Sequence, residues 1–172
     1  MNLHTTAFIR VLKHPLKFRM FLLFKLPSAF ICGVRLRDID ERHCVVTVPY
    51  KWLSQNPFRS TYFACLSMAA EMSTGALALA HLHKRNPAVS MLVVKVESEY
   101  FKKATRRTTF VCDDGEAMLK VIEESVATGE GKIFRAKSTG KNPDGETVAE
   151  FYITWSFKAK TPAPEREWER GL

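Results

Sequence analysis

The stretch STYFACLSMAAEMSTGALALAHLH, residues 60–83, decides how the chain folds. Between Arg59 and Lys84, Glu71 is the only formally charged side chain, and the other residues are apolar, small or hydroxylated. Such a run predicts a helix that is buried on most of its sides. A transmembrane span is the weaker interpretation, because the run is barely hydrophobic and Glu71 near the bilayer centre would cost ~3 kcal/mol or more.

Glu71 is therefore the first candidate for a functional residue. Burial without a partner disfavours the ionised carboxylate and raises its pKa, which suits a general base or a nucleophile near neutral pH. The competing interpretation is a structural carboxylate that pairs with a Lys or Arg from elsewhere in the chain, or that caps backbone groups. The sequence leaves both interpretations open.

One stripe of the predicted helix carries small and polar side chains. At alternating steps of four and three residues it contains Ser67, Glu71, Thr74, Ala78 and His81, with Gly75 beside it. Such a seam predicts that something other than the ordinary core packs there, either a second copy of the helix or a ligand. Ser67 and Thr74 are therefore candidate substrate-binding residues.

Length and composition indicate one folded domain. The chain has 172 residues, no low-complexity tract and no internal repeat. Its net charge of +8 favours acidic partners, but nucleic-acid binding has no support beyond that charge and is not expected. The four cysteines are scattered, which is typical of reduced thiols in a cytoplasmic protein, and no metal-binding motif occurs.

Residues 1–28 are basic and very apolar, and Pro15 divides them into two short segments. A signal peptide would need a longer uninterrupted apolar region and a clear cleavage site. One interpretation is a helical arm that covers the domain's apolar surface. The other is a segment that touches an anionic membrane peripherally, and both can hold together.

The rest of the chain reads as an antiparallel sheet with a surface helix. Residues with a period of two begin at Ala29, and a polar turn at 38–42 makes the first hairpin. Further strands are predicted at 44–50, 90–101, 108–112, 132–139 and 147–158, with a surface helix that begins at Asp113 or Asp114 and ends at Gly129 or Gly131. We expect an arm at 1–28, an α+β domain at 29–158 and a polar tail at 159–172.

A sheet of about six strands around a central apolar helix resembles the hotdog fold. The region from Asn56 to Glu71 resembles the signature of phenylacetyl-CoA-thioesterase-like hotdog proteins, in which an Asn precedes a His-Gly-Gly by six residues and an acid follows the His by nine. Asn56 and Glu71 match in type and spacing, whereas Tyr62, Phe63 and Ala64 stand where the family has His-Gly-Gly. The tract NPFRSTYFA also resembles a hotdog family of unknown function.

This resemblance implies hydrolysis of an acyl-CoA or a similar acyl thioester, with no cofactor beyond the coenzyme A of the substrate. Glu71 would be the general base or nucleophile, and the backbone N–H of Phe63 would polarise the thioester carbonyl. Asn56 would orient the carbonyl or the water, and Tyr62 would donate a hydrogen bond where the family has His. A hotdog protein that binds an acyl chain or a partner without hydrolysis is the alternative.

The helix geometry adds an expectation about assembly. Nine residues at about 1.5 Å each separate Glu71 from Tyr62 by roughly 13 Å along the helix, too far for both to reach one carbonyl. A two-fold pair of helices would bring Glu71 of one subunit to the helix start of the other. The sequence therefore predicts a homodimer, or a dimer of dimers, in agreement with the dimeric sites of hotdog proteins.

Other candidates concern the carrier and the nucleophile. The loop KKATRR supplies cations for the phosphates of coenzyme A, namely Lys102, Lys103, Arg106 and Arg107, although charge runs are usually solvated. Cys65 lies in the first helical turn, where the dipole lowers a thiol pKa, but buried Cys is more often an apolar filler. A hotdog dehydratase lacks support, since its His-Phe-Pro-Gly type of element is missing.

Overall fold

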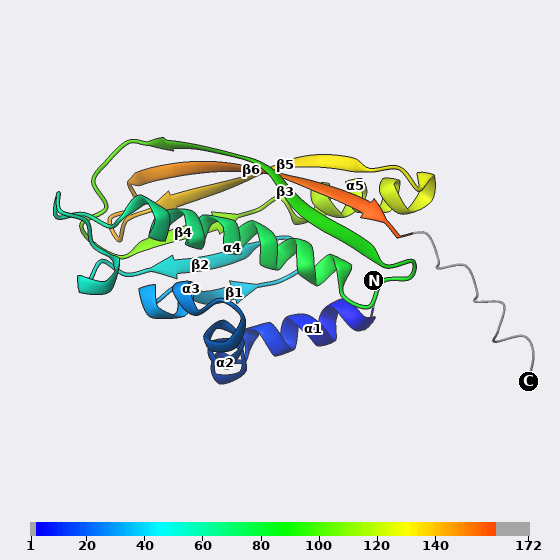
Figure 1. The fold of residues 1–172 in the computed structure, drawn as a ribbon, viewed down its shortest axis with the longest axis horizontal. Helices are drawn as coiled ribbons and strands as arrows, with labels where there is room; N and C mark the ends of the chain where they lie inside the picture. Colours follow the sequence, from blue (N-terminus) through cyan, green and yellow to red (C-terminus); the bar gives the residue numbers. More distant parts are fainter. Residues whose placement is uncertain (1–2, 161–172) are drawn as a thin grey trace, which may run out of the picture.

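The computed structural model describes residues 3–160 (Figure 1), so the expected polar tail lies outside the described residues from position 161 onward. The helices are α1 (Leu3–Lys13), α2 (Pro15–Lys25), α3 (Pro27–Cys32), α4 (Phe63–Leu82) and α5 (Gly115–Thr128), with a 3-10 turn at Trp52–Ser54. The strands are β1 (Arg35–Ile39), β2 (Cys44–Val48), β3 (Val89–Tyr100), β4 (Thr108–Cys112), β5 (Lys132–Lys141) and β6 (Thr147–Ala159).

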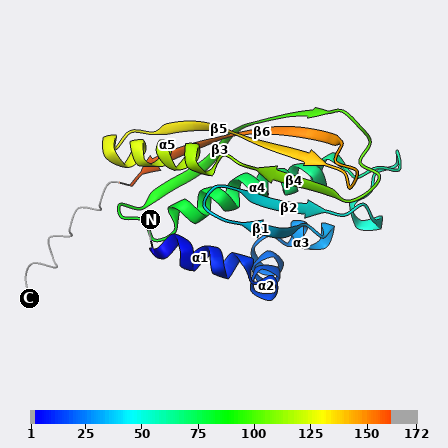
Figure 2. The same cartoon turned by 180° about the vertical axis from the view of Figure 1, so that it is seen from behind.

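The strands form one antiparallel six-stranded sheet in the order β1-β2-β4-β5-β6-β3. The sheet wraps around α4, which packs against β2, β4 and β5 (Figure 1). α5 packs against β5 and β6, and the view from behind shows it on the outside of the molecule (Figure 2). This is the α+β arrangement that the sequence predicts, and it leaves β1 and β3 at the two edges.

The central helix α4 is buried as its composition predicts. It is long and apolar enough to cross a membrane, but most of it is enclosed by the domain, and Leu77 and Ala78 are fully buried. Apolar side chains of the sheet, among them Phe110 and Phe157, complete the core around it. α4 is therefore the core helix of the domain, and its alanines and glycine allow the sheet to approach closely.

The N-terminal segment is helical and breaks before Pro15, as expected, but it continues further than the expected boundary. α3 begins with Pro27 and ends at Cys32, and it is capped by Gly33, whose φ of 80° is a left-handed conformation that favours glycine. The strand pattern thus begins at Arg35 rather than at Ala29. A helix of six residues is too short to show a helical period in the sequence.

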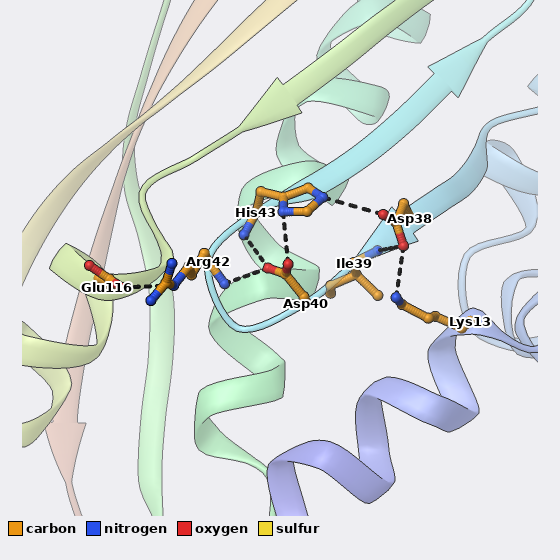
Figure 3. A network of polar contacts seen from close by, with 7 residues as sticks. All are labelled: Lys13, Asp38, Ile39, Asp40, Arg42, His43 and Glu116. Atoms are coloured by element: carbon orange, nitrogen blue, oxygen red, sulfur yellow. Dashed lines mark hydrogen bonds and ion pairs between the residues drawn. The ribbon is translucent and has the colours of Figure 1, made fainter. Parts of the chain in front are cut away.

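A polar network attaches this N-terminal segment to the β1–β2 turn. Figure 3 shows its members Lys13, Asp38, Ile39, Asp40, Arg42, His43 and Glu116. Lys13 Nζ lies 2.9 Å from Asp38 Oδ1, and Arg42 Nε lies 2.8 Å from Glu116 Oε1 on α5. The hydrogen bond from Lys13 lowers the pKa of Asp38. Because these pairs are largely exposed, each adds at most about 1 kcal/mol, and apolar packing carries most of the attachment.

Candidate active site in two pockets

The carboxylate of Glu71 has neither a hydrogen-bond partner nor an ion-pair partner within residues 3–160. It lies on a pocket of about 180 Å³ between α4 and the N-terminal helices. The walls are otherwise apolar apart from one lysine, and they consist of Phe8, Val11, Leu12, Lys17, Phe18, Phe21, Leu26, Met72, Gly75, Ala76, Leu79 and Met91. The structure therefore does not support the interpretation of Glu71 as a structural ion-pair residue.

Gly75 lets the Glu71 carboxylate lie close to the helix. A Cβ atom at position 75 would stand 2.9 Å from Glu71 Oε1 and 3.2 Å from the Trp155 ring. A side chain here would displace either the carboxylate or the indole. Burial raises the pKa of Glu71, because the apolar surroundings disfavour its charged form. The pocket thus holds a carboxylate with enhanced basicity and free oxygens.

The small, polar seam of α4 has a different explanation from the one that we inferred. Thr74, Ala78 and His81 are buried within the chain itself, so a second helix does not pack on them. The Thr74 hydroxyl accepts a hydrogen bond from Trp155 Nε1 at 3.0 Å and donates one to the Glu71 carbonyl at 3.0 Å. Small residues are required because the indole of β6 packs there. Ser67 is half-buried and lies in neither pocket of the candidate site.

The start of α4 exposes backbone donors. The N–H groups of Cys65 and Leu66 point to the carbonyl of Tyr62 at 2.9 and 3.3 Å, whereas those of Phe63 and Ala64 have no acceptor within residues 3–160. They lie at the positive end of the helix dipole, where a developing negative charge is stabilised. A second pocket, of about 540 Å³, opens here and includes Asn56, Tyr62 and Phe63 in its lining.

Asn56 already has a local role. Its Oδ1 accepts hydrogen bonds from the backbone N–H groups of Phe58 and Ser60 at 3.0 and 3.2 Å, and its Nδ2 contacts Ser60 Oγ at 3.1 Å. The side chain therefore closes the turn that leads into α4. It lies on the pocket at the helix start, and in this chain it acts first as a turn residue.

The cations of the KKATRR loop separate into different environments. Lys102 pairs with Glu146, and Arg106 pairs with Asp144 at 2.9 Å, so the turn between β5 and β6 neutralises both. Lys102 and Lys103 lie on the pocket at the helix start, but only Lys103 has no ion pair there within residues 3–160. Arg107 lies elsewhere, in a pocket beside β1 and β2.

The two pockets of the candidate site share no residue within the described part of the chain. Glu71 belongs to the first, and Asn56, Tyr62 and Phe63 belong to the second. Because α4 is one continuous helix from Phe63 to Leu82, its rise separates Glu71 from Tyr62 at the helix start by roughly 13 Å along the axis, as expected. One subunit alone does not bring the predicted catalytic residues together.

Comparison with known proteins identifies the family. The profile of a family described as a domain of unknown function, DUF4442, matches residues 16–157. The chain belongs to this family. No curated protein matches the sequence.

Several solved structures share the fold of this DUF4442 protein. A Pseudomonas aeruginosa protein of unknown function, named as a probable thioesterase, has a TM-score of 0.71 at 18% identity over 85% of this chain and 97% of that chain. A Chlorobaculum tepidum protein of unknown function has a TM-score of 0.70 at 16% identity, over 85% and 97% of the chains. A Haemophilus influenzae thioesterase has a TM-score of 0.60 at 10% identity, over 84% and 91%. The fold is the hotdog fold.

Two other groups considered from the sequence have weak chemical support in the DUF4442 domain. Burial, with a further contribution from Cys32 at 3.4 Å, raises the pKa of the Cys65 thiol to about 12, so Cys65 is a poor nucleophile. Within residues 3–160, no group of three or more His, Cys, Asp or Glu side chains is arranged to hold a metal ion.

Sequence reasoning missed the residues that enclose Glu71. Phe8, Val11, Phe18 and Phe21 come from the N-terminal helices, which we interpreted as a cover for the domain or as a membrane contact. The high apolar content of residues 1–28 was the available signal, but it does not show which part of the domain the arm covers. The packing of Trp155 on Gly75 had no signal in the sequence beyond the glycine itself.

Proposed function

We propose that this protein hydrolyses an acyl thioester, carried by coenzyme A or by an acyl carrier protein. The observation that supports the proposal is the Glu71 carboxylate, which has free oxygens and a raised pKa on the wall of an apolar pocket. A structural carboxylate would have a partner. The similarity to structures named as thioesterases agrees with this activity, although at 10–18% identity it speaks for the fold alone.

The chemistry assigns one role to each pocket. As general base, Glu71 takes a proton from water while the water oxygen attacks the thioester carbonyl. The free N–H groups of Phe63 and Ala64 stabilise the oxyanion, after which the C–S bond breaks and the thiol leaves with the proton. Direct attack by Glu71 would give an anhydride that water then hydrolyses. Both routes yield a carboxylic acid and a free thiol.

The proposed site requires two subunits. Since the two pockets are separate within one chain, we assign Glu71 of one subunit and the α4 start of its partner to the same substrate. Strand β3 supports such an assembly, because it is a long edge strand with exposed apolar side chains, including Leu92 and Val94. An edge of this kind favours pairing with another strand, and two-fold pairing of β3 with its copy would extend the sheet.

The decisive experiment compares the wild type with Glu71→Gln on a panel of acyl-CoA substrates of different chain length. We expect kcat/KM to fall by about a thousandfold or more, because the variant keeps the shape of the side chain but cannot accept a proton. Binding of the product acid or of free coenzyme A serves as the control for an intact site. Equal turnover by the two proteins would refute the role of Glu71.

The second candidate function is binding of an acyl ligand without turnover. Its support is the helix start, where Phe63 stands in place of the first glycine of the thioesterase signature and is 57% exposed. Tyr62, which stands in place of the histidine, packs beside it. These rings narrow the approach of a thioester to the backbone donors. In that case the wild type shows no turnover on any substrate, and Glu71→Gln binds a neutral acyl ligand as well as the wild type or better.

A further inference from the structure

A second charged site lies outside the proposed active site, and we call it the basic pocket. It has a volume of about 260 Å³ beside β1 and β2, and all its charged lining residues are cationic: Arg19, Arg35, Arg37, Lys51 and Arg107. None of the five forms an ion pair within residues 3–160. The remaining lining consists of Gly33, Thr47 and Pro49.

The cations of the basic pocket lie close together without an acidic partner. Other clustered cations have one, as Lys102 and Arg106 show. Here Arg37 Nε finds only the hydroxyl of Thr47, at 2.9 Å. Arg19 lies over the ring of Phe30 at 3.8 Å, and its Nη1 is buried without any hydrogen-bond partner within the described residues. An anion with several oxygens would satisfy these donors.

The electrostatics agree with this geometry. Burial and the neighbouring cations Arg107 and Arg35 lower the pKa of Arg37, and burial and Arg35 lower that of Arg19. These guanidinium groups stay protonated, so their mutual repulsion is a cost that a bound anion would remove. A planar guanidinium group can donate two parallel N–H hydrogen bonds to two oxygens of one phosphate. A phosphate ester is the ligand group that fits.

Helix α2 presents an apolar face next to the basic pocket. Phe18 and Leu22 on its inner side are buried, yet the opposite side carries Leu16, Met20, Leu23 and Phe24, which we call the α2 apolar face. Leu16 is 66% exposed and Phe24 is 72% exposed. Their spacing of four, three and one residues places them on one side of the helix. A helix that is apolar on both sides needs a second apolar surface.

A groove connects the two features. It has a volume of about 390 Å³ and runs between α1, α2 and β1, with Leu12, Pro15, Leu16, Phe18 and Leu36 as its apolar lining. Its other lining residues, Arg19, Arg35 and Arg37, also belong to the basic pocket. An apolar surface thus passes directly into a phosphate-type site. A phospholipid has this combination of groups, an acyl chain next to a phosphate.

The charge of the whole N-terminal region selects an anionic bilayer. Residues 1–37 contain no Asp or Glu. Arg10, Lys17 and Lys25 are exposed and have no ion pair within residues 3–160, whereas Lys13 pairs with Asp38. Cations beside an exposed apolar helix face are the features of a segment that lies in the membrane interface. In Figures 1 and 2, α1 and α2 form an outer layer of the molecule that such a surface can reach.

We propose that the α2 apolar face and the basic pocket together dock this protein on anionic phospholipid bilayers. The side chains Leu16, Met20, Leu23 and Phe24 enter the boundary between headgroups and acyl chains. The phosphate of one anionic headgroup binds among Arg19, Arg35, Arg37, Lys51 and Arg107. This docking does not depend on hydrolysis, and it is measured without any thioester.

The test is co-sedimentation of the full chain with vesicles of phosphatidylcholine, alone or mixed with phosphatidylglycerol. We expect binding to the mixed vesicles only, and weaker binding as salt rises. Leu16→Glu/Phe24→Glu and Arg35→Glu/Arg37→Glu should each lower the partition coefficient at least about tenfold. The matched controls, Ile133→Glu and Lys120→Glu/Lys158→Glu, change exposed residues of other elements and should bind like the wild type.

Several results would overturn the proposal. The first is equal binding to both kinds of vesicle, and the second is binding by both double variants at the wild-type level. The third is an altered oligomeric state of Leu16→Glu/Phe24→Glu in sedimentation, which would assign the α2 apolar face to an interface between copies of the chain. Binding of inorganic pyrophosphate that requires Arg35 and Arg37, without vesicle binding, would make the pocket a site for soluble phosphates. Circular dichroism establishes that each variant is folded, and Lys51→Glu/Arg107→Glu tests the same pocket independently.

Discussion

At the scale of single residues, Glu71 concentrates an electrostatic cost in one side chain. Its carboxylate has no partner and apolar neighbours, so ionisation is less favourable in the folded protein than in the unfolded chain. Proteins keep such a group where the basicity is useful. The cost has consequences for stability and for activity, and both can be measured.

The first prediction concerns stability as a function of pH. Because folding raises the pKa of Glu71, the unfolded chain releases this proton first as the pH rises. The Glu71 contribution to stability therefore falls between the ordinary Glu pKa and the raised one, and then stays constant. Denaturant unfolding from mildly acidic to neutral pH should show Glu71→Gln gaining stability relative to the wild type. A difference that does not change with pH would contradict the shift.

The same shift predicts the pH dependence of turnover. A general base acts in its ionised form, so kcat/KM should rise with pH and level off above the raised pKa of Glu71. The midpoint should lie above the ordinary Glu value of about 4.3. A profile that is flat across mildly acidic pH, while the enzyme stays folded, would assign the base to another group.

At the scale of secondary-structure elements, the start of α4 supplies the backbone N–H groups that we assign to the oxyanion site. Proline is tolerated at the first helical residue, and Tyr62 already has a backbone conformation compatible with a following proline, with φ −62° and ψ 135°. Phe63→Pro therefore removes one N–H from the proposed oxyanion site and leaves the helix intact. We expect kcat to fall by about a hundredfold, whereas Phe63→Ala, which keeps the N–H, should retain or raise activity.

The loop before β4 makes a separate prediction. Lys103 lies on the pocket at the helix start and has no ion pair there, whereas Lys102 and Arg106 are neutralised by the turn between β5 and β6. Lys103→Glu should raise KM for an acyl-CoA severalfold and leave kcat unchanged, because carrier binding is equal in the ground and transition states. Lys120→Glu is the control on another element. An unchanged KM would exclude Lys103 from carrier binding.

The elements also show how far sequence patterns reach. Along the chain, the strands follow from a period of two residues, the surface helix from a period of 3.6, and the buried helix from an apolar run with a single charge, and the structure confirms these elements. The shift of register between Val93 and Lys95 in the pairing of β3 with β6 is different, because it depends on the partner strand and not on the local sequence pattern. Glu71 was visible as a lone charge in an apolar run. Its pocket was not, because the walls come from helices that are distant in the sequence.

At the scale of the whole molecule, the proposed site makes a prediction about mixed subunits. Glu71→Gln and Phe63→Pro each inactivate their own homodimer. A mixed dimer has one site with both defects and one site with none, so equal exchange restores about a quarter of wild-type activity. Co-expression of the two tagged chains tests this restoration. Activity that stays at the level of the parent variants would show that one subunit builds each site. Independently, sedimentation of the wild type at micromolar concentration should show a dimer or a larger assembly.

Helices α1 and α2 cover Glu71, so the protonation of its carboxylate is coupled to the opening and closing of the N-terminal arm. Phe8, Phe18 and Phe21 exclude water from the carboxylate, so lifting α1 and α2 would rehydrate it and return it towards ordinary acidity. Reciprocally, a protonated Glu71 favours the closed arm, and an ionised one favours release. Proteolytic nicking between α2 and α3 should consequently accelerate as the solution becomes more alkaline, and Glu71→Gln should abolish that acceleration.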